Sequence, residues 1–272
     1  MLKKIVLGVV AALCIVLTSC SSDDDSIRLT VKSNAYDVFR SLVDENGQRL
    51  IPDQLENGRQ VRFSYFLLKW PERSSDNSKI IETRQVYADN IKSTVEYTSP
   101  ELEPGKYYVI VVADLIDPAK EYNILTIDDF GYILNNKEVA GALNAFGVAY
   151  DDNLEIDSKK EIVLNPQRKG ALVTLLLKNS HLMTQTNCTF HSGFEYFACG
   201  VYWRFSANSK LVDYELSPDI TKIQYYTIAG EGVFGKGLIK LDGAKTYDIQ
   251  PQHGENIVVQ YDYETRKYSE VY

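Results

Sequence analysis

The sequence predicts an all-β protein that folds as two tandem β-sandwich domains, and three observations support this fold class. Short runs of alternating apolar and polar residues recur along the chain and are separated by clusters of turn residues. Helical periodicity is almost absent. Tyrosine, which favours strands and half-buried surfaces, occurs 19 times. Short strands at this spacing are typical of β-sandwiches.

Two strands with one buried face are expected early in the chain. Residues 27–32 alternate apolar with polar side chains, so one face of this strand should meet the core. Residues 61–67 alternate in the same way, with Arg62 and Ser64 on the polar side. We therefore expect these two polar side chains to face solvent.

A central strand is expected further along. A polar loop at residues 71–79 and a strand at residues 91–97 precede residues 106–113, which are apolar on both faces. A strand without a polar face belongs in the middle of a sheet that is covered on both sides. Residues 138–146 are the one expected short helix.

The second half repeats the theme of short strands. Residues 151–160 are polar and charged, which suggests a linker, and residues 170–177 are again apolar on both faces. The other strands expected in this half are 161–164, 196–205, 222–229, 233–241, 257–263 and 268–272. We place the boundary near residues 157–170, and assign residues 27–160 to the N-terminal sandwich and 161–272 to the C-terminal one.

The N-terminus has the pattern of an export signal. Two lysines precede residues 5–17, an uncharged apolar run that is shorter than the roughly 20 residues needed to span a bilayer. The run ends in Leu17-Thr18-Ser19-Cys20, which resembles the lipobox of bacterial lipoproteins. The resemblance implies that residues 1–19 are a signal peptide and that Cys20 is acylated. The alternative is an ordinary secretory signal that contains a cysteine.

An acidic tether, residues 20–26, follows the cleavage site. It contains Ser21-Ser22-Asp23-Asp24-Asp25, which resembles the export signal of Bacteroidetes surface lipoproteins. The resemblance implies a protein held by the lipid of Cys20 on the outer membrane and exposed at the cell surface. A plain solvated tether is also compatible with this composition.

Two cysteines remain in the expected mature domains, Cys188 and Cys199. An even pair in an exported protein favours a disulfide, which would contribute roughly 3 kcal/mol in the chain-entropy model. Free thiols are a second reading. A zinc site is a third, because His181 and His191 lie close in sequence, although the paired short spacing typical of zinc ligands is incomplete.

Two motifs carry a resemblance to a known family. They are Leu102-Glu-Pro-Gly-Lys-Tyr-Tyr-Val109 and Ile162-Val-Leu-Asn-Pro-Gln-Arg-Lys-Gly-Ala-Leu-Val173. Together with the lipoprotein leader, they resemble the two-domain fimbrillin-like proteins of Bacteroidales, especially the anchor and minor fimbrial subunits. The resemblance implies a transthyretin-like first domain and partnership with other fimbrial subunits by β-strand exchange.

The resemblance also bears on whether a protease cuts this chain near its N-terminus. In its polymerising members a protease cuts after an arginine in an early loop and removes the first strand. Arg40, Arg49 and Arg59 lie in the polar stretch after the first expected strand, and any of them could serve, but we favour the reading that they are solvated arginines. Without a cut, the first strand stays with its lipid and the protein acts as an anchor or terminator.

Signals for other chemistry are weak. The net charge of −8 and the lack of a basic stripe argue against nucleic-acid binding. Residues 230–235 match a dinucleotide fingerprint in letters, but a strand-like run follows where a helix is needed. Residues 151–157 alternate oxygen ligands like a calcium loop but lack its glycine. We therefore expect no catalytic, cofactor-binding or metal-binding residues, and no enzyme activity.

The leading hypothesis is a lipid-anchored cell-surface structural protein, a fimbrial anchor or minor subunit. The alternative is a surface glycan-binding lipoprotein of a polysaccharide uptake system, and host or glycan ligands are compatible with either role. A glycan binder needs exposed aromatic platforms, for which Trp70 and Trp203 are candidates. Their positions within alternating strands favour core packing. A lipid-anchored hydrolase is a third, weaker hypothesis.

Overall fold

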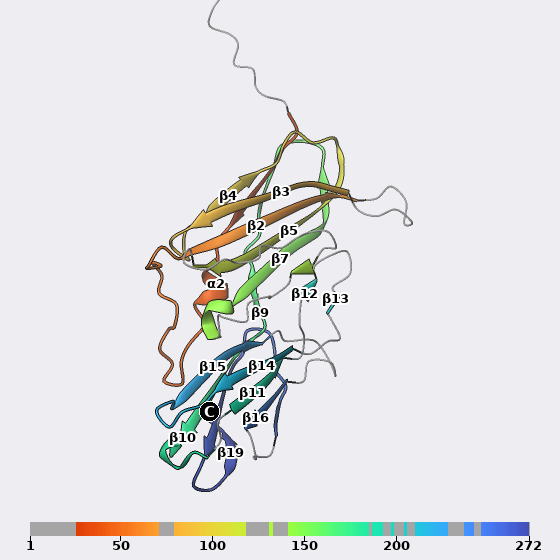
Figure 1. Ribbon diagram of the computed structural model, residues 1–272. Coiled ribbons are helices and arrows are strands. Elements are labelled where there is room, and N and C mark those ends of the chain that lie inside the picture. Colours follow the sequence, from red (N-terminus) through yellow and green to blue (C-terminus); the bar gives the residue numbers. More distant parts are fainter. Residues whose placement is uncertain are drawn as a thin grey trace, which may run out of the picture.

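The computed structural model describes residues 26–70, 79–117, 131–132, 141–184, 187–192, 197–198, 204–205, 210–227, 237–241 and 246–271. Within these residues almost all regular structure is β-strand, which confirms the predicted all-β fold (Figure 1). The helical elements described are short: α2 (Tyr36–Phe39) and the 3₁₀ helices η1 (Gly141–Asn144) and η2 (Ser180–Leu182).

The largest sheet has five antiparallel strands in the order β3-β2-β5-β7-β9. They are β2 (Gln60–Lys69), β3 (Lys79–Ala88), β5 (Gly105–Ile116), β7 (Phe146–Ile156) and β9 (Gln167–Lys169). β5 is central and buried on both faces, as its apolar sequence predicts. At its start, the Tyr107 hydroxyl donates a 2.7 Å hydrogen bond back to the Glu103 carbonyl oxygen and fixes the turn that enters the strand.

A three-stranded sheet packs against this one. Its order is β4-β1-β8, with β4 (Val95–Thr98), β1 (Leu29–Ser33) and β8 (Lys160–Val163). The Tyr65 ring of β2 stacks on the Tyr97 ring of β4 at 4.9 Å, and the Tyr97 hydroxyl donates to Glu82 of β3 at 2.8 Å. The two sheets therefore share one core and form a sandwich.

Two expectations for the strands of this half need correction. Arg62 and Ser64 do not face solvent: β2 is buried on both faces, and Arg62 forms an ion pair with Asp114 of β5. The expected strand at residues 91–97 is confined to β4, because the preceding residues form the turn that follows β3.

Two expectations around β7 also need correction. The expected linker at residues 151–160 is occupied largely by β7, whose Leu154 and Ile156 reach the core between exposed acidic residues. The expected helix at residues 138–146 is reduced, within its described part, to the single turn of η1, and Phe146 already belongs to β7.

The second half contains two four-stranded sheets (Figure 1). One has the order β15-β10-β18-β19, with β15 (Lys222–Thr227), β10 (Ala171–Lys178), β18 (Asn256–Asp262) and β19 (Lys267–Glu270). The other has the order β14-β11-β16-β17, with β14 (Lys210–Glu215), β11 (Asn187–Ser192), β16 (Gly237–Leu241) and β17 (Tyr247–Ile249). A second core, rich in tyrosine, lies between them. A small separate sheet joins β13 (Arg204–Phe205) and β12 (Phe197–Ala198) of the second half to β6 (Gly131–Tyr132) of the first half.

Strand pairing changes partners at Gly170. Residues 161–169, which the sequence assigns to the C-terminal sandwich, pair instead with the first half, because β8 pairs with β1 and β9 with β7. The next strand, β10, pairs only with strands of the second half. Gly170 has φ +93°, and a Cβ at this position would lie 2.4 Å from the carbonyl oxygen of Thr227. The join therefore requires glycine.

Candidate functional site

The candidate site is the slot that β1 occupies between β4 and β8. Leu29, Val31 and Ser33 of β1 are fully buried, while the side chains between them are only partly covered. This alternation follows from the sequence, because a strand with one apolar face turns that face to the opposing sheet. The slot therefore accepts an extended segment that carries small or apolar side chains at alternate positions.

Both neighbours of β1 pair with it along its length. β4 runs antiparallel to β1, and the Leu29 amide donates to the Ser99 hydroxyl at 3.0 Å just beyond β4. β8 runs parallel to β1, and the Lys32 ammonium forms a 2.8 Å ion pair with Glu161. Among the described strands, β4 and β8 pair only with β1. Removal of β1 would therefore expose two strand edges that face each other.

The end of β1 is fixed by hydrogen bonds to two other segments. The backbone amide and the side-chain amide of Asn34 both donate to the Asn165 side-chain oxygen, at 3.0 and 3.1 Å. The Ala35 amide then donates to the carbonyl oxygen of Ile91, in the turn between β3 and β4, at 3.3 Å. The chain thereafter enters α2, whose first residue is Tyr36.

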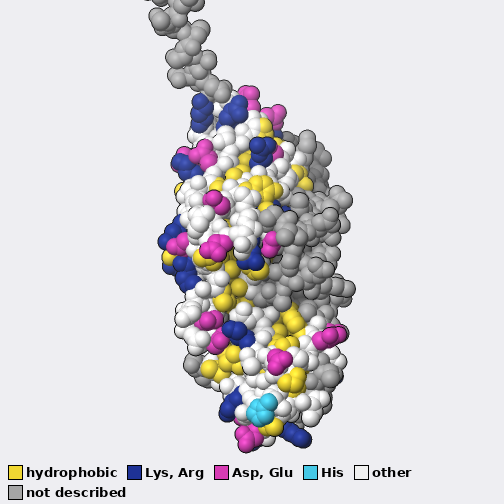
Figure 2. Space-filling model, turned by 60° about the vertical axis from the view of Figure 1, so that its left-hand side comes forward, with side chains coloured by type: hydrophobic (Ala, Val, Ile, Leu, Met, Phe, Trp, Pro, Cys, Tyr) yellow, Lys and Arg dark blue, Asp and Glu magenta, His cyan; other side chains and the backbone are white. Residues whose placement is uncertain are grey.

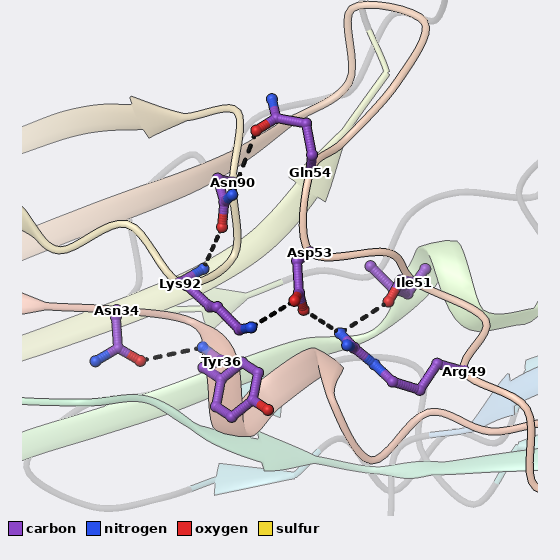
Figure 3. Close-up of polar contacts among 8 residues, drawn as sticks. All are labelled: Asn34, Tyr36, Arg49, Ile51, Asp53, Gln54, Asn90 and Lys92. Atoms are coloured by element: carbon purple, nitrogen blue, oxygen red, sulfur yellow. Dashed lines mark hydrogen bonds and ion pairs between the residues drawn. The ribbon is translucent and has the colours of Figure 1, made fainter.

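A compact group of charged side chains surrounds the ring of Tyr36. We call Tyr36, Arg49, Asp53 and Lys92 the Tyr36 cluster; Figure 3 shows Asp53 between the charged ends of Arg49 and Lys92. One Asp53 oxygen lies 2.7 Å from the Arg49 guanidinium, and the other lies 2.5 Å from the Lys92 ammonium. Both cations also lie over the Tyr36 ring, at 6.0 and 5.4 Å from its centroid.

The ion pairs shift the pKa values of the cluster. The Lys92 ammonium and the Arg49 guanidinium hold the pKa of the Asp53 carboxyl below its ordinary value. The same carboxylate raises the pKa of Lys92. Both groups are therefore charged at neutral pH, and the cluster is a set of ion pairs that joins separate segments.

The three arginines expected as cleavage candidates are each paired with an acidic side chain. Arg40 lies 3.0 Å from Asp37 and over the Tyr36 ring, and Arg59 lies 3.3 Å from Asp117. Arg49 belongs to the Tyr36 cluster. The pairs of Arg40 and Arg49 lie within the stretch that follows β1, whereas Arg59 joins this stretch to the end of β5.

The structure describes only one of the three residues in the predicted lipid and disulfide sites. Cys20 and Cys199 lie outside the described residues, while Cys188 of β11 is fully buried in the second core. The acylation and the disulfide therefore stay predictions. Of the rival zinc ligands, His181 is exposed on η2. Among the residues that the structure describes, no group of three or more histidine, cysteine or acidic side chains is placed to hold a metal ion.

The predicted aromatic platform at Trp70 is already engaged. Its indole nitrogen donates to the carbonyl oxygen of Asp152 at 2.8 Å, and the Lys106 ammonium lies 5.1 Å from the ring centroid. The ring also packs against Tyr108. These contacts favour core packing for Trp70 over an exposed platform for sugars. Trp203 and the glycine-rich residues 230–235 lie outside the described part of the chain.

The described surface carries both signs of charge. On the face in Figure 2, acidic and basic side chains lie close to one another, with hydrophobic side chains between them. In the described part of the chain, no helix combines the length and the apolar composition that a membrane crossing requires.

Comparison with known proteins gives matches in structure only. No protein-family model and no curated protein matches the sequence. A candidate adhesin of Bacteroides thetaiotaomicron has a TM-score of 0.50 at 6% identity, covering 89% of this chain and 94% of that one. The fimbrial anchor protein Mfa2 of Porphyromonas gingivalis has a TM-score of 0.48 at 9% identity, covering 89% and 95%. A fimbrial assembly protein of Parabacteroides distasonis has a TM-score of 0.43 at 9% identity, covering 90% and 98%.

These likenesses concern the fold. The match to the Bacteroides thetaiotaomicron protein extends over nearly the whole of both chains, so the chain has the same overall arrangement of β-sheets. The other two similar structures are a fimbrial anchor protein and a fimbrial assembly protein, each with a TM-score below 0.5. At such low identity, a shared fold does not by itself assign a function.

Proposed function

We propose that this chain is a lipid-anchored cell-surface structural protein, a fimbrial anchor or minor subunit that assembles with its neighbours by β-strand exchange. The slot of β1 is the observation that supports this role. A strand that alone joins β4 to β8 can be replaced by an equivalent strand from another subunit without rearrangement of the larger sheet. In this role the chain binds and holds, and we expect it to catalyse no reaction.

The chemistry of the slot is suited to a donated strand. Burial of Leu29 and Val31 contributes roughly 1.5–3 kcal/mol for each side chain relative to exposure, and an incoming strand with matching residues recovers that contribution. The backbone groups of β4 and β8 supply hydrogen bonds that do not depend on the donor's sequence. The buried positions that alternate along the slot would select the donor strand, and the backbone hydrogen bonds to β4 and β8 would provide affinity.

The position of β1 in the chain distinguishes an anchor from a polymerising subunit. Cys20 precedes β1, so the folded domain of a chain that keeps β1 in its slot stays joined to the lipid expected on Cys20. Such a chain would hold the base of a fimbria at the membrane. A chain that loses β1 would instead accept the strand of its neighbour and extend the polymer.

Strand exchange can be tested on the full chain with a labelled peptide of residues 27–35. We expect an excess of this peptide to be taken up, as followed by native mass spectrometry of the complex. A matched peptide with Val31→Asp should not bind, because an unpaired carboxylate would enter a buried pocket. Equal uptake of the two peptides, or of neither, would contradict the proposal.

The anchoring role can be tested in cells. Cys20→Ala should release the protein from the membrane fraction, and deletion of the gene should release fimbriae into the medium. A control substitution, Ser22→Ala, alters the tether without touching the expected acylation site and should leave the protein with the membrane. Fimbriae that stay attached in the deletion strain would exclude the anchor role.

A further inference from the structure

We infer that the Tyr36 cluster is a latch that controls the release of β1 from its slot, and that Asp53 holds this latch closed. The inference rests on the proposed strand exchange, because it assigns the regulation of the same slot. It follows from the segments that the cluster joins, from the carboxylate that two of its cations share and from its connection to the end of β1.

The cluster joins three segments that are distant in sequence. Tyr36 opens α2 directly after β1, Arg49 and Asp53 belong to the loop between α2 and β2, and Lys92 lies in the turn between β3 and β4 (Figure 3). Backbone bonds reinforce the contact of loop and turn, with the Ile91 amide donating to the Asp53 carbonyl oxygen at 2.9 Å. The side chains of Gln54 and Asn90 add a further bond at 3.3 Å. Loop and turn therefore move as one unit while the cluster is intact.

The cluster has one carboxylate for two cations and so carries a net charge of +1. The carboxylate of Asp53 lies between Arg49 and Lys92, and Arg40, the third cation over the Tyr36 ring, has Asp37 at 3.0 Å. Every cation over the ring thus lies beside a carboxylate, and Arg49 and Lys92 depend on the same one. The arrangement is suited to holding segments of the protein together.

Asp53 is the least replaceable member of the cluster. Without its carboxylate, the Arg49 guanidinium and the Lys92 ammonium would remain over the same ring as two unneutralised positive charges. Like charges over one ring repel, so the contact of the loop with the turn would weaken, although their backbone hydrogen bonds would remain. The Arg49 guanidinium would keep its 3.1 Å hydrogen bond to the carbonyl oxygen of Ile51, which lies within the loop and holds nothing across the gap.

The turn transmits this change to β1. The Ile91 carbonyl oxygen accepts from the Ala35 amide, and the Ile91 amide donates to the backbone carbonyl oxygen of Asp53, so one residue links the loop that carries Asp53 to the end of the strand. When the turn moves away, Ala35 loses its acceptor and Tyr36 loses the cations above its ring. Apart from the pairing of β1 with β4 and β8, the end of the strand is then held by the bonds of Asn34 to Asn165, and the strand can open from this end.

Hydrogen exchange on the full chain tests the latch directly. We expect Asp53→Asn to raise the exchange rate of the amides of residues 29–33 by about tenfold, as expected for the loss of charge-assisted bonds. Asp37→Asn is the matched control. It removes an acidic partner beside the same ring but touches neither the loop nor the turn, and should change these rates by less than about twofold. The amides of β5 should be unaffected in both variants.

Two results would overturn the latch. One is an unchanged exchange rate of the β1 amides in Asp53→Asn. The other is an equal rise in the rates of β1 and β5, because that would mean a general loss of stability. Raised salt provides a second variable: it should speed β1 exchange in the unmodified chain and have little effect in Asp53→Asn.

Uptake of the residue 27–35 peptide separates the latch from the proposed function. Faster uptake by Asp53→Asn than by the unmodified chain supports both. Faster hydrogen exchange of β1 without any uptake keeps the latch and rejects strand exchange. Uptake at equal rates by the two chains rejects the latch and keeps strand exchange.

Discussion

β1 and β5 are both the central strand of a sheet, yet they differ in how firmly they are held. β5 has 12 residues, is buried on both faces and pairs with β2 at ten positions. β1 has five residues, buries one face and pairs with each neighbour at four positions. A central position alone therefore does not make a strand a permanent part of the scaffold.

The difference explains why β1, and not β5, is the strand that we propose is exchanged. Loss of β5 would expose apolar side chains on two faces and separate β2 from β7. Loss of β1 would open one narrow groove and leave the five-stranded sheet complete. The five-stranded sheet and the strand proposed to exchange thus lie on opposite sides of the same core.

The largest effect is expected at the buried ion pair of the scaffold. The Arg62 guanidinium donates two hydrogen bonds to the Asp114 carboxylate, at 2.9 and 2.5 Å, and both side chains are buried. Asp114→Ala leaves a buried guanidinium without this carboxylate and should lower the free energy of unfolding by about 3–5 kcal/mol. Urea denaturation followed by circular dichroism measures this loss.

A double substitution is the control for that prediction. Replacement of both partners by apolar residues, Arg62→Met with Asp114→Leu, removes the unpaired charge and should recover most of the stability. A double variant as unstable as Asp114→Ala would mean that the pair is not the cause of the loss.

A substitution at Gly170, where the two halves join, should lower the free energy of unfolding nearly as much as Asp114→Ala. Gly170→Ala places a methyl group 2.4 Å from the Thr227 carbonyl oxygen at φ +93°, and should cost roughly 2–4 kcal/mol from backbone strain and overpacking. Gly47→Ala shares the positive φ, at +76°, but meets nothing within 4 Å. Its cost should be limited to about 1 kcal/mol, as calorimetry can verify.

A paired substitution sharpens the contrast between the two strands. Val31→Ala in β1 and Val111→Ala in β5 remove the same group from fully buried sites, and each should cost about 2 kcal/mol. An excess of the residue 27–35 peptide should restore the melting temperature of Val31→Ala only, since the peptide replaces β1 and cannot replace β5. Rescue of both variants, or of neither, would remove the distinction drawn between the strands.

Of these changes, a fall in pH is expected to have the smallest effect on stability. Because Lys92 and Arg49 lower the pKa of Asp53, this carboxylate binds protons less readily in the folded state than in the unfolded state. Its contribution to stability is fully present above its ordinary pKa of 3.8 and is lost as the pH falls through the lower folded value. Hydrogen exchange of β1, corrected for its intrinsic pH dependence, should accelerate over that range. Asp53→Asn should show no such acceleration.

Patterns of apolar residues predicted the scaffold well. The runs at residues 106–113 and 170–177 lack a polar face, and both became buried strands, β5 and β10. β3 escaped prediction because its apolar residues are interrupted by charged ones, as suits an edge strand. The supposed linker was β7, where acidic residues alternate with buried ones and conceal the strand.

The candidate site was predictable only in its first part. The alternation at residues 27–32 predicted the buried face of β1, but no local signal indicated that β8 would be its parallel neighbour. The Tyr36 cluster has no sequence signature, because its members come from three segments and each is an ordinary surface residue type. Only the fold brings them together.

The parallel pairing of β1 with β8 has a consequence for the order of folding. Lys32 and Glu161 face each other across this pair although 129 residues separate them in the chain. Closing so long a loop is slow, and parallel strands cannot form through a local hairpin, so we expect the first strand to be the last to dock. A newly made molecule would then pass through a stage in which the groove is formed but empty. During that interval any extended polypeptide nearby would compete with the molecule's own N-terminal strand, so folding kinetics would decide which strand fills the groove.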